Sequence, residues 1–570
     1  QNGDGTGSGG SWIDLSSNLY VGPDMFDDFN VQGGYDLTIA IKPNDPNVIF
    51  IGGTNLYRST DGFTTPDNVQ QVGGYDIGTE LPLFNSYPNH HPDQHALVFL
   101  PSNPDILFSL SDGGIARTDN CLAETIDWTS MNNGYVSSQF YTLAVNHSDT
   151  SNIILGGLQD NGTYYTNNAR PDLPWVMPFN YDGAYCAIPN NADYFLVSTQ
   201  KCRIVKVQLS DEGDLLAWER IDPQLDRDEF QFINPFVLDP NDNGIIYLPT
   251  KTKLWVNPYM YTLPLTNSFD STMVGWYANA DTLPEAGLEF TAIAVSTTPA
   301  ERAYLGTSGQ KVYRIDEALS GYSPLVDITG ADFPADAYVS SLAVDPRDGD
   351  KLMVVFSNYN IYSLYYTEDG GASWSAIASN LEQNPSGTGN GPSLRWANIL
   401  PITADSTAYF VGTSIGLYHS SSLSGSSTVW TQMSPDLIGN NIITYIETRE
   451  LDDLVLVATH GNGVYSANTP GDPLNVGILL AEPVSVSKLS AYPNPAQSIL
   501  TISFTLTTNN TAQLRIFDAL GRQMAEPLLP TTLSKGTYSY PYNVSNLQSG
   551  IYYYTLETDT FKKTNSFIVQ

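Results

Sequence analysis

The chain has 570 residues, which is long for one ordinary domain and predicts either several domains or one large repetitive domain. Hydrophobic residues make up 41% of it and aromatic residues 12%, so a sizeable core can form and intrinsic disorder is disfavoured. The net charge is −36, from 24 basic and 60 acidic residues, and so acidic a chain is repelled by phosphate backbones, which argues against a nucleic-acid partner.

The start of the chain carries no basic or apolar signal region, and we interpret Gln1–Asp4 as the beginning of a mature or trimmed product. No stretch approaches 18 consecutive apolar residues, so we expect no transmembrane segment. Three cysteines, Cys121, Cys186 and Cys202, are too few for a disulfide scaffold. We expect free thiols, because Cys186 and Cys202 fall two predicted strands apart, roughly 10 Å, which is beyond disulfide reach.

Residues 1–470 repeat one unit. Each copy begins with an apolar strand, continues through two further strands separated by a Gly-containing turn, and usually ends with a fourth strand that carries Trp. The mean spacing of about 51 residues is typical of propeller blades. We therefore predict an all-β chain that begins with a large β-propeller of about eight to nine four-stranded blades. The nine first strands open at Thr38, Ala96, Thr142, Tyr185, Pro235, Thr291, Ser341, Asn398 and Ile446.

The last copy lacks a fourth strand after Tyr465, while Ser11–Leu15 form an unattached strand pattern near the start. We predict that this N-terminal strand completes the final blade and closes the ring. A linker is expected over residues 471–487, because Pro and Gly are frequent there and the charge turns from strongly acidic to slightly basic. A second domain is then expected over residues 488–570.

The segment Thr367–Trp374, with the sequence Thr-Glu-Asp-Gly-Gly-Ala-Ser-Trp, resembles the Asp-box (BNR) repeat of sialidases, sortilin-type receptors and family 74 xyloglucanases. In that repeat the Asp and Thr/Ser side chains bond the turn backbone and Trp packs into the blade, so the resemblance implies a fold rather than an activity. Further motifs, including His90–Leu97 and Gly156–Gly162, resemble a large bacterial family of BNR-repeat proteins. A sialidase is disfavoured, because the Arg-Ile-Pro sequence of its arginine cluster is missing.

Propeller geometry gathers polar residues of several copies on one face, around the central channel. The chain enters each first strand, and turns from each second to each third strand, at that face. We expect this face to bind a glycan or a protein, with Tyr and Trp side chains as platforms. The expected binding residues are His91, His95, Gln139, Gln159, Asn161 and His460.

Four carboxylates on the same rim give an alternative function, glycoside hydrolysis. That reaction needs two carboxyl groups about 5 to 10 Å apart, with pKa values driven apart by their surroundings. A structural role in Asp-Gly turns is the competing interpretation for two of them. A further alternative is a structural subunit of a surface assembly. The candidate catalytic residues are Asp93, Asp112, Asp160 and Asp182.

Two segments carry candidate metal ligands. In an extended segment, His91, Asp93 and His95 project to one side, and imidazole with carboxylate suits Zn or Mn. Hydrogen bonding to neighbouring blades is the competing interpretation. A second segment offers oxygen ligands for Ca²⁺, but it lacks a distal Glu and also fits an ordinary turn. No cofactor is firmly predicted. The oxygen ligands of the second segment are Asp239, Asn241 and Asp242.

Residues 488–570 alternate strands with turn residues, which predicts a small Ig-like β-sandwich. Together their motifs resemble the type A sorting domain of the type IX secretion system of Bacteroidetes. The resemblance implies export across the outer membrane, an extracellular or surface-attached location, and binding to the secretion shuttle and outer-membrane machinery. It is carried by Pro493, Asn494, Pro495, Gly521, Arg522, Gly550, Tyr552 and Lys562.

Exported proteins of this kind carry O-linked glycans at three-residue sequences. In these, Asp comes first, Ser or Thr second, and an apolar residue or Thr third. Three triplets in the chain fit the pattern, and intact mass tests their occupancy. The candidate attachment sites are Ser271, Thr282 and Ser406.

Overall fold

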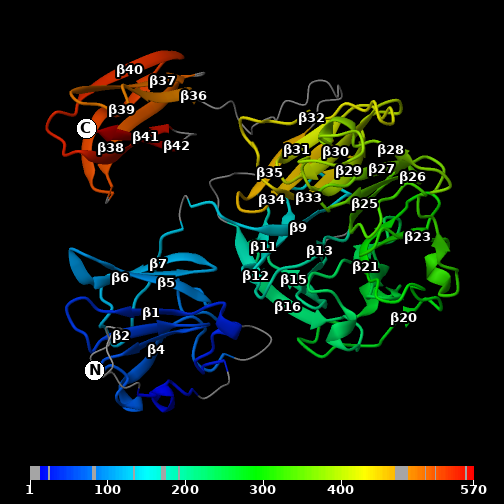
Figure 1. The fold of residues 1–570 in the computed structure, drawn as a ribbon, viewed down its shortest axis with the longest axis horizontal. Coiled ribbons are helices and arrows are strands. Elements are labelled where there is room, and N and C mark those ends of the chain that lie inside the picture. Colours follow the sequence, from blue (N-terminus) through cyan, green and yellow to red (C-terminus); the bar gives the residue numbers. More distant parts are fainter. Residues whose placement is uncertain are drawn as a thin grey trace. The chain divides into compact units, whose positions relative to one another are not determined.

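The computed structural model describes residues 13–22, 26–79, 85–132, 135–168, 175–190, 193–468, 486–506, 509–519, 521–558 and 562–570. The chain divides into two compact units, residues 1–477 and residues 478–570. Both units are built from antiparallel strands, and a few single-turn 3₁₀ helices lie between strands of the first unit (Figure 1). The prediction of an all-β chain is confirmed. The 3₁₀ helices are η1 Ser16–Asn18, η2 Gln32–Gly34, η3 Pro66–Asn68, η4 Arg227–Glu229, η5 Met260–Thr262, η6 Ala318–Ser320 and η7 Ser379–Leu381.

Within its described residues the first unit contains nine sheets, eight of four strands and one of three, each a simple up-and-down succession. The first three are β1–β4 (Thr38–Ile41, Ile49–Gly52, Leu56–Ser59, Val69–Gly73), β5–β8 (Gln94–Leu100, Asn103–Ser111, Gly114–Thr118, Thr129–Ser130) and β9–β12 (Phe140–Val145, Ile154–Leu158, Gly162–Thr166, Val176–Phe179). The next three are β13–β16 (Cys186–Ala187, Phe195–Thr199, Arg203–Leu209, Leu215–Arg220), β17–β20 (Val237–Leu238, Ile246–Pro249, Leu254–Asn257, Tyr277–Ala278) and β21–β24 (Phe290–Val295, Ala303–Thr307, Val312–Ile315, Val326–Asp327). The last three are β25–β28 (Val339–Asp345, Asp348–Phe356, Leu364–Thr367, Ser375–Ala376), β29–β32 (Leu394–Pro401, Thr407–Thr413, Gly416–Ser420, Thr431–Gln432) and β33–β35 (Ile443–Arg449, Leu454–Thr459, Val464–Asn468).

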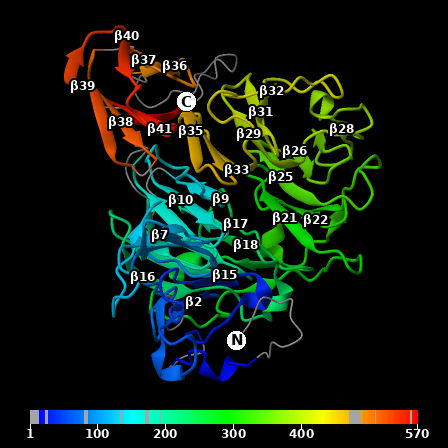
Figure 2. The ribbon, with the colours of Figure 1, turned by 60° about the vertical axis from the view of Figure 1, so that its left-hand side comes forward.

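Seven of these sheets, from β9–β12 to β33–β35, follow one another around a ring, and β33 lies beside β9 (Figures 1 and 2). Phe140 of β9 packs in one hydrophobic cluster with Leu456 of β34. The Thr444 hydroxyl donates a hydrogen bond to the Phe140 carbonyl at 2.7 Å. The guanidinium of Arg449, a residue only 2% exposed, donates to the carbonyls of Asn146 and Ser151. The ring among the described residues therefore has seven blades and not the predicted eight to nine, and its last blade packs against its first.

The first two sheets lie outside this ring and pack on each other through residues such as Phe50 and Trp128. Ring closure by the N-terminal strand is therefore wrong for the part that is described. Ile13–Leu15 form no strand, and Leu15 packs against Tyr57 of the first sheet; Ser11 and Trp12 lie outside the described residues. The physical reason is that the N-terminal segment is held at the first sheet, where the Asn18 side-chain amide also donates to the Phe63 carbonyl at 2.8 Å.

The turns that resemble the Asp-box repeat make the expected hydrogen bonds. Asp369 accepts from the Thr367 hydroxyl at 2.7 Å and from the Ser373 backbone amide at 2.8 Å. The tryptophans that close the blades also bond across blades, because each indole N–H donates to a carbonyl of the preceding sheet. The pairs are Trp128 to Val72, Trp276 to Ile221, Trp374 to Ile328 and Trp430 to Ile377.

The second unit is a two-layer sandwich, as predicted. Its sheets pair in the orders β36–β37–β40 and β39–β38–β41–β42. Alternate residues of facing strands fill the core, including Phe504, Ile516 and Phe567. The strands are β36 Val486–Tyr492, β37 Ile499–Leu506, β38 Asn510–Asp518, β39 Gln523–Leu533, β40 Gly536–Asn543, β41 Gly550–Thr558 and β42 Lys562–Val569.

Candidate functional site

A cavity of about 600 Å³, here called the cleft, lies where the two outer sheets meet sheets β9–β12 and β13–β16 of the ring. It opens where second strands turn into third strands, which is the predicted functional face. Because the two outer sheets are not part of the ring, the predicted site residues gather here and not around the central channel. Carboxyl, amide and tyrosine side chains make up most of its lining.

Asp93 lines the cleft, and the carboxyl group of Asp36 is buried next to it. Asp93 precedes β5 in a left-handed backbone conformation, with φ of 60°, and accepts a hydrogen bond from the Gln32 amide at 2.6 Å. Asp36 is fully buried, next to Thr54 and Asp93, and neither of its oxygens accepts a well-aligned hydrogen bond. Burial, followed by the charges of Asp36 and Asp112, raises the pKa of Asp93 to about 8. Burial also raises the pKa of Asp36.

A second pair of carboxyl groups, Asp160 and Asp182, also lines the cleft. Asp160 sits in the turn from β10 to β11, again with a positive φ of 59°, and its backbone amide donates to Asp182 Oδ1 at 2.9 Å. Burial, followed by the charges of Asp182 and Asp112, raises the pKa of Asp160 to about 7. Burial raises the pKa of Asp182 as well. A pKa near 7 leaves Asp160 partly protonated at neutral pH.

Asp112 lies near both pairs. Its carboxylate contacts His95 Nε2 at 2.6 Å and accepts from the Tyr35 hydroxyl at 3.2 Å, while its carbonyl accepts from the Asn161 amide at 3.3 Å. Burial, followed by the charge of Asp112, raises the pKa of Tyr35 to about 12. The structure therefore brings together all four predicted carboxylates, and it adds a fifth that was not among the candidate catalytic residues, Asp36.

The remaining binding-face residues separate into two groups. His91 and Asn161 line the cleft. Gln139, Gln159 and His460 lie at the closing seam of the ring: Gln139 forms an isolated β-bridge with His460, and the Gln159 backbone N–H donates to the Gln139 backbone carbonyl at 3.0 Å. The bridge between Gln139 and His460 therefore joins the last blade to the first.

The predicted metal ligands do not converge. Among the described residues no group of three or more His, Cys, Asp or Glu side chains is placed to hold a metal ion. The two ring nitrogens of His91 contact the carbonyls of Pro92 and Asp160, at 3.0 and 2.9 Å, while His95 and Asp93 turn to other partners.

The candidate calcium segment is a hydrogen-bonded turn. Asp239 Oδ1 accepts from the backbone amides of Asn241 and Asp242 at 2.8 and 3.2 Å, and its Oδ2 accepts from the Tyr247 hydroxyl at 2.9 Å. Asp242 in turn accepts from the Gly244 amide at 2.9 Å. These oxygens have protein partners.

The three candidate glycosylation sites lie at the surface. Thr282 is exposed, and Ser271 and Ser406 are half-buried. The cysteines Cys121, Cys186 and Cys202 are free and buried, as expected.

Residues 490–570 match a family model described as a secretion system C-terminal sorting domain. The C-terminal unit is a type IX secretion sorting domain. Such a domain indicates export to the cell surface or the extracellular space. Among the described residues no helix has the length and apolar character needed to cross a membrane.

The sorting-domain residues that carried the resemblance occupy turns and strand ends. Asn494, between Pro493 and Pro495, accepts from the Ile568 amide at 2.9 Å, and Arg522 bonds Asp518 beside Gly521, whose φ is 75°. The Tyr552 hydroxyl donates to the Gln548 carbonyl at 3.0 Å. Gly550 begins β41 and Lys562 begins β42.

No curated protein matches the chain. Among solved structures, the chain is similar to a GH74 xyloglucanase from Xanthomonas campestris, with a TM-score of 0.46 and 14% identity. The similarity covers 75% of this chain and 58% of that one, so the chain spans less than two thirds of that enzyme's length.

Proposed function

We propose that the exported protein binds a polysaccharide chain in the cleft and hydrolyses its glycosidic bonds. The observation that carries the proposal is that Asp93, Asp160 and Asp182 line one cleft, with Asp36 buried next to Asp93. Asp93 and Asp160 lie close enough that the charge of Asp160 raises the pKa of Asp93. Glycoside hydrolysis requires a proton donor and a carboxylate that face each other across the scissile bond.

Asp93 suits the role of proton donor. A carboxyl group with a pKa near 8 stays protonated at neutral pH, and the Gln32 amide fixes its orientation. The pair of Asp160 and Asp182 is partly protonated, which leaves a carboxylate to activate water.

The walls of the cleft also suit a sugar chain. Tyr75, Tyr164 and Tyr181 line it together with the amide side chains of Asn132 and Asn161. Aromatic rings stack on the apolar faces of sugars, and amides bond their hydroxyl groups.

The test is a panel of polysaccharides scored for both binding and release of reducing ends. We expect Asp93→Asn and Asp160→Asn each to lower turnover at least about 100-fold while binding remains. Asp193→Asn, at an exposed position outside the cleft, is the matched control and keeps full activity. Binding without turnover by the unaltered protein overturns hydrolysis and leaves the cleft as a glycan-binding site. If both variants keep binding and turnover, the assignment of the active site to the cleft is overturned.

Export through the type IX system follows from the sorting domain, and so does interaction with the secretion machinery. We propose that the shuttle recognises the sandwich itself. Removal of residues 488–570 is then expected to abolish secretion without altering activity in the cleft.

A further inference from the structure

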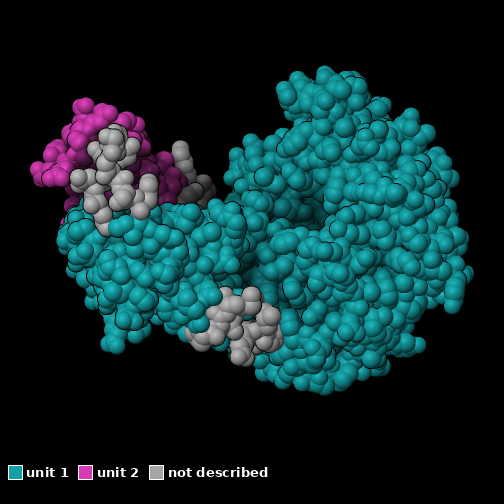
Figure 3. Space-filling model, turned by 60° about the horizontal axis from the view of Figure 1, so that its bottom comes forward, with its two compact units in different colours: residues 1–477 teal, residues 478–570 magenta. Residues whose placement is uncertain are grey.

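The interior of the seven-bladed ring is a second cavity, distinct from the cleft, of about 510 Å³. We call it the lumen. The space-filling view shows the hollow at the centre of the ring (Figure 3). Residues on or next to the innermost strand of every one of the seven sheets line it, which places the lumen on the axis of the ring. A cavity of this volume is within the range of sites that hold small organic molecules.

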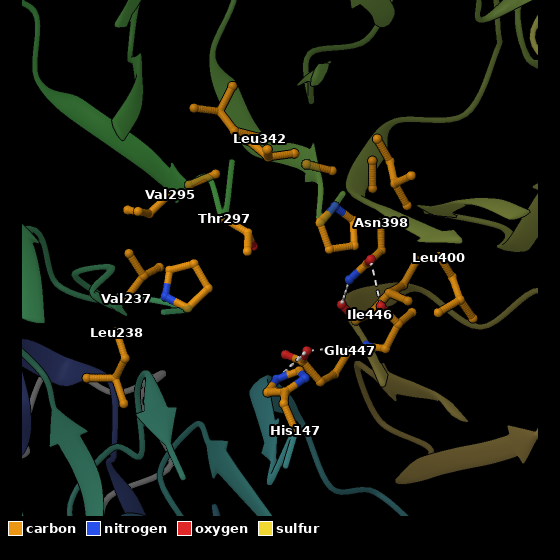
Figure 4. A pocket seen from close by; sticks show the side chains of 18 of the residues that line it. His147, Val237, Leu238, Val295, Thr297, Leu342, Asn398, Leu400, Ile446 and Glu447 are labelled. Carbon is orange, nitrogen blue, oxygen red and sulfur yellow. Dashed lines mark hydrogen bonds and ion pairs between the residues drawn. The ribbon is translucent and has the colours of Figure 1, made fainter. Parts of the chain in front are cut away.

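The wall of the lumen is partly aliphatic and partly polar. Successive innermost strands contribute Val237, Val295 and Leu342, which lie around the open space in Figure 4. Amide side chains of the lining are engaged by the protein: Asn398, for example, donates to the Ile446 carbonyl and accepts from the Thr448 hydroxyl. Such a wall favours the apolar part of a ligand by about 25 cal/mol for each Å² removed from water.

Three aromatic residues lie toward the end of the lumen where the innermost strands begin. Trp396 of β29 lies against Tyr445 of β33, with ring centroids 4.2 Å apart, and Tyr185 meets Tyr445 edge-on at 6.4 Å. All three line the lumen. Aromatic faces attract ammonium groups, most strongly when water is excluded.

One ionisable pair faces the lumen from its wall. His147, which follows β9, and Glu447 of β33 approach to 3.5 Å, and Figure 4 shows them turned toward each other. The His147 side chain is 54% exposed and the Glu447 side chain 16% exposed, so solvent reaches both. Burial raises the pKa of Glu447 to about 8, which favours its protonated form in the empty lumen at neutral pH.

We propose that the lumen binds a small amphiphilic cation, with its apolar body against the aliphatic part of the wall and its ammonium group between Glu447 and the aromatic residues. The lining favours a cation over an anion. Glu450 is paired with Arg347, which leaves Glu447, beside the aromatic residues, as the carboxyl group of the lining that a ligand can engage, and the whole chain carries a net charge of −36. Binding of the cation ionises Glu447, which releases a proton.

The test uses the full chain and three six-carbon probes that differ in charge: hexyltrimethylammonium, hexanol and hexanoate. Titration calorimetry at pH 7, in buffers of different ionisation enthalpy, measures affinity and proton release together. We expect saturable binding of the ammonium at least tenfold tighter than that of hexanol, no binding of hexanoate, and release of part of a proton. Trp396 emission is expected to change on binding.

Glu447→Gln preserves the shape of the site and is expected to weaken ammonium binding about tenfold and to abolish proton release. Glu212→Gln, at an exposed position outside the lumen, is the matched control and leaves both unchanged. Equal affinity for hexanol and the ammonium, an unaltered Glu447→Gln variant, or absence of saturable binding would each overturn the proposal. Circular dichroism of each variant separates lost binding from lost folding.

Discussion

Arg449 closes the propeller, and its removal should open the ring. Among the described residues, no strand is shared between the first and last blades of the ring. Polar contacts at the seam therefore help to hold these two blades together. The Arg449 guanidinium donates to the carbonyls of Asn146 and Ser151 at 3.2 and 2.9 Å, and pairs in a bidentate manner with Asp452 at 2.8 and 2.9 Å. Arg449→Met keeps most of the buried volume but leaves these acceptors without a donor.

The magnitude follows from burial. Arg449 is 2% exposed, and breaking a buried charged pair costs about 3–5 kcal/mol, a large part of the 5–15 kcal/mol that holds a typical domain folded. The Asp452 side chain is 23% exposed, so partial hydration places the expected loss at the lower end, about 3 kcal/mol. Urea unfolding followed by tryptophan fluorescence measures the free energy. Arg347→Met, which removes a 41% exposed arginine paired with Glu450, is the control and should cost less than about 1 kcal/mol. Equal losses in the two variants would refute the role of Arg449 at the seam.

Three further predictions concern the cleft, the blade contacts and the thiols. The pKa of Asp93 is raised in the folded state, so its contribution to stability is fully present below about pH 4 and is lost as pH rises through about 8. Asp93→Asn should therefore raise the melting temperature at pH 9 and change it little at pH 4. An equal change at both pH values would contradict the raised pKa. Trp430→Phe removes the indole bond to Ile377 and should lower the free energy of unfolding by about 1–3 kcal/mol, whereas a loss below about 0.5 kcal/mol would show that this bond contributes little. Burial raises the pKa of Cys186 to about 12, so this thiol should react with a disulfide reagent only after unfolding, and prompt reaction in the native protein would contradict its burial.

Local features of the sequence determined much of this protein. The first strand of each of the nine sheets begins close to the position that the repeats predicted. The signals for such strands are alternating apolar residues and turns with Pro, Asn, Asp or Gly, and they depend only on a few neighbouring residues. Asp369 bonds residues two and four positions away, so its turn is encoded in one short segment. The sorting domain was readable for the same reason, since its motifs lie within residues 490–570.

The tertiary structure alone decided which blade closes the ring and how the carboxyl groups pair. Phe140 and Leu456 meet through side-chain packing between segments more than 300 residues apart, a choice that no local periodicity encodes. Asp36 was not among the candidate catalytic residues, because its burial beside Asp93 depends on how the outer sheets pack. The left-handed conformations of Asp93 and Asp160 place both residues in the lining of the cleft. The pKa values that make these groups candidates for catalysis arise from burial and mutual charge, which exist only once the sheets have assembled.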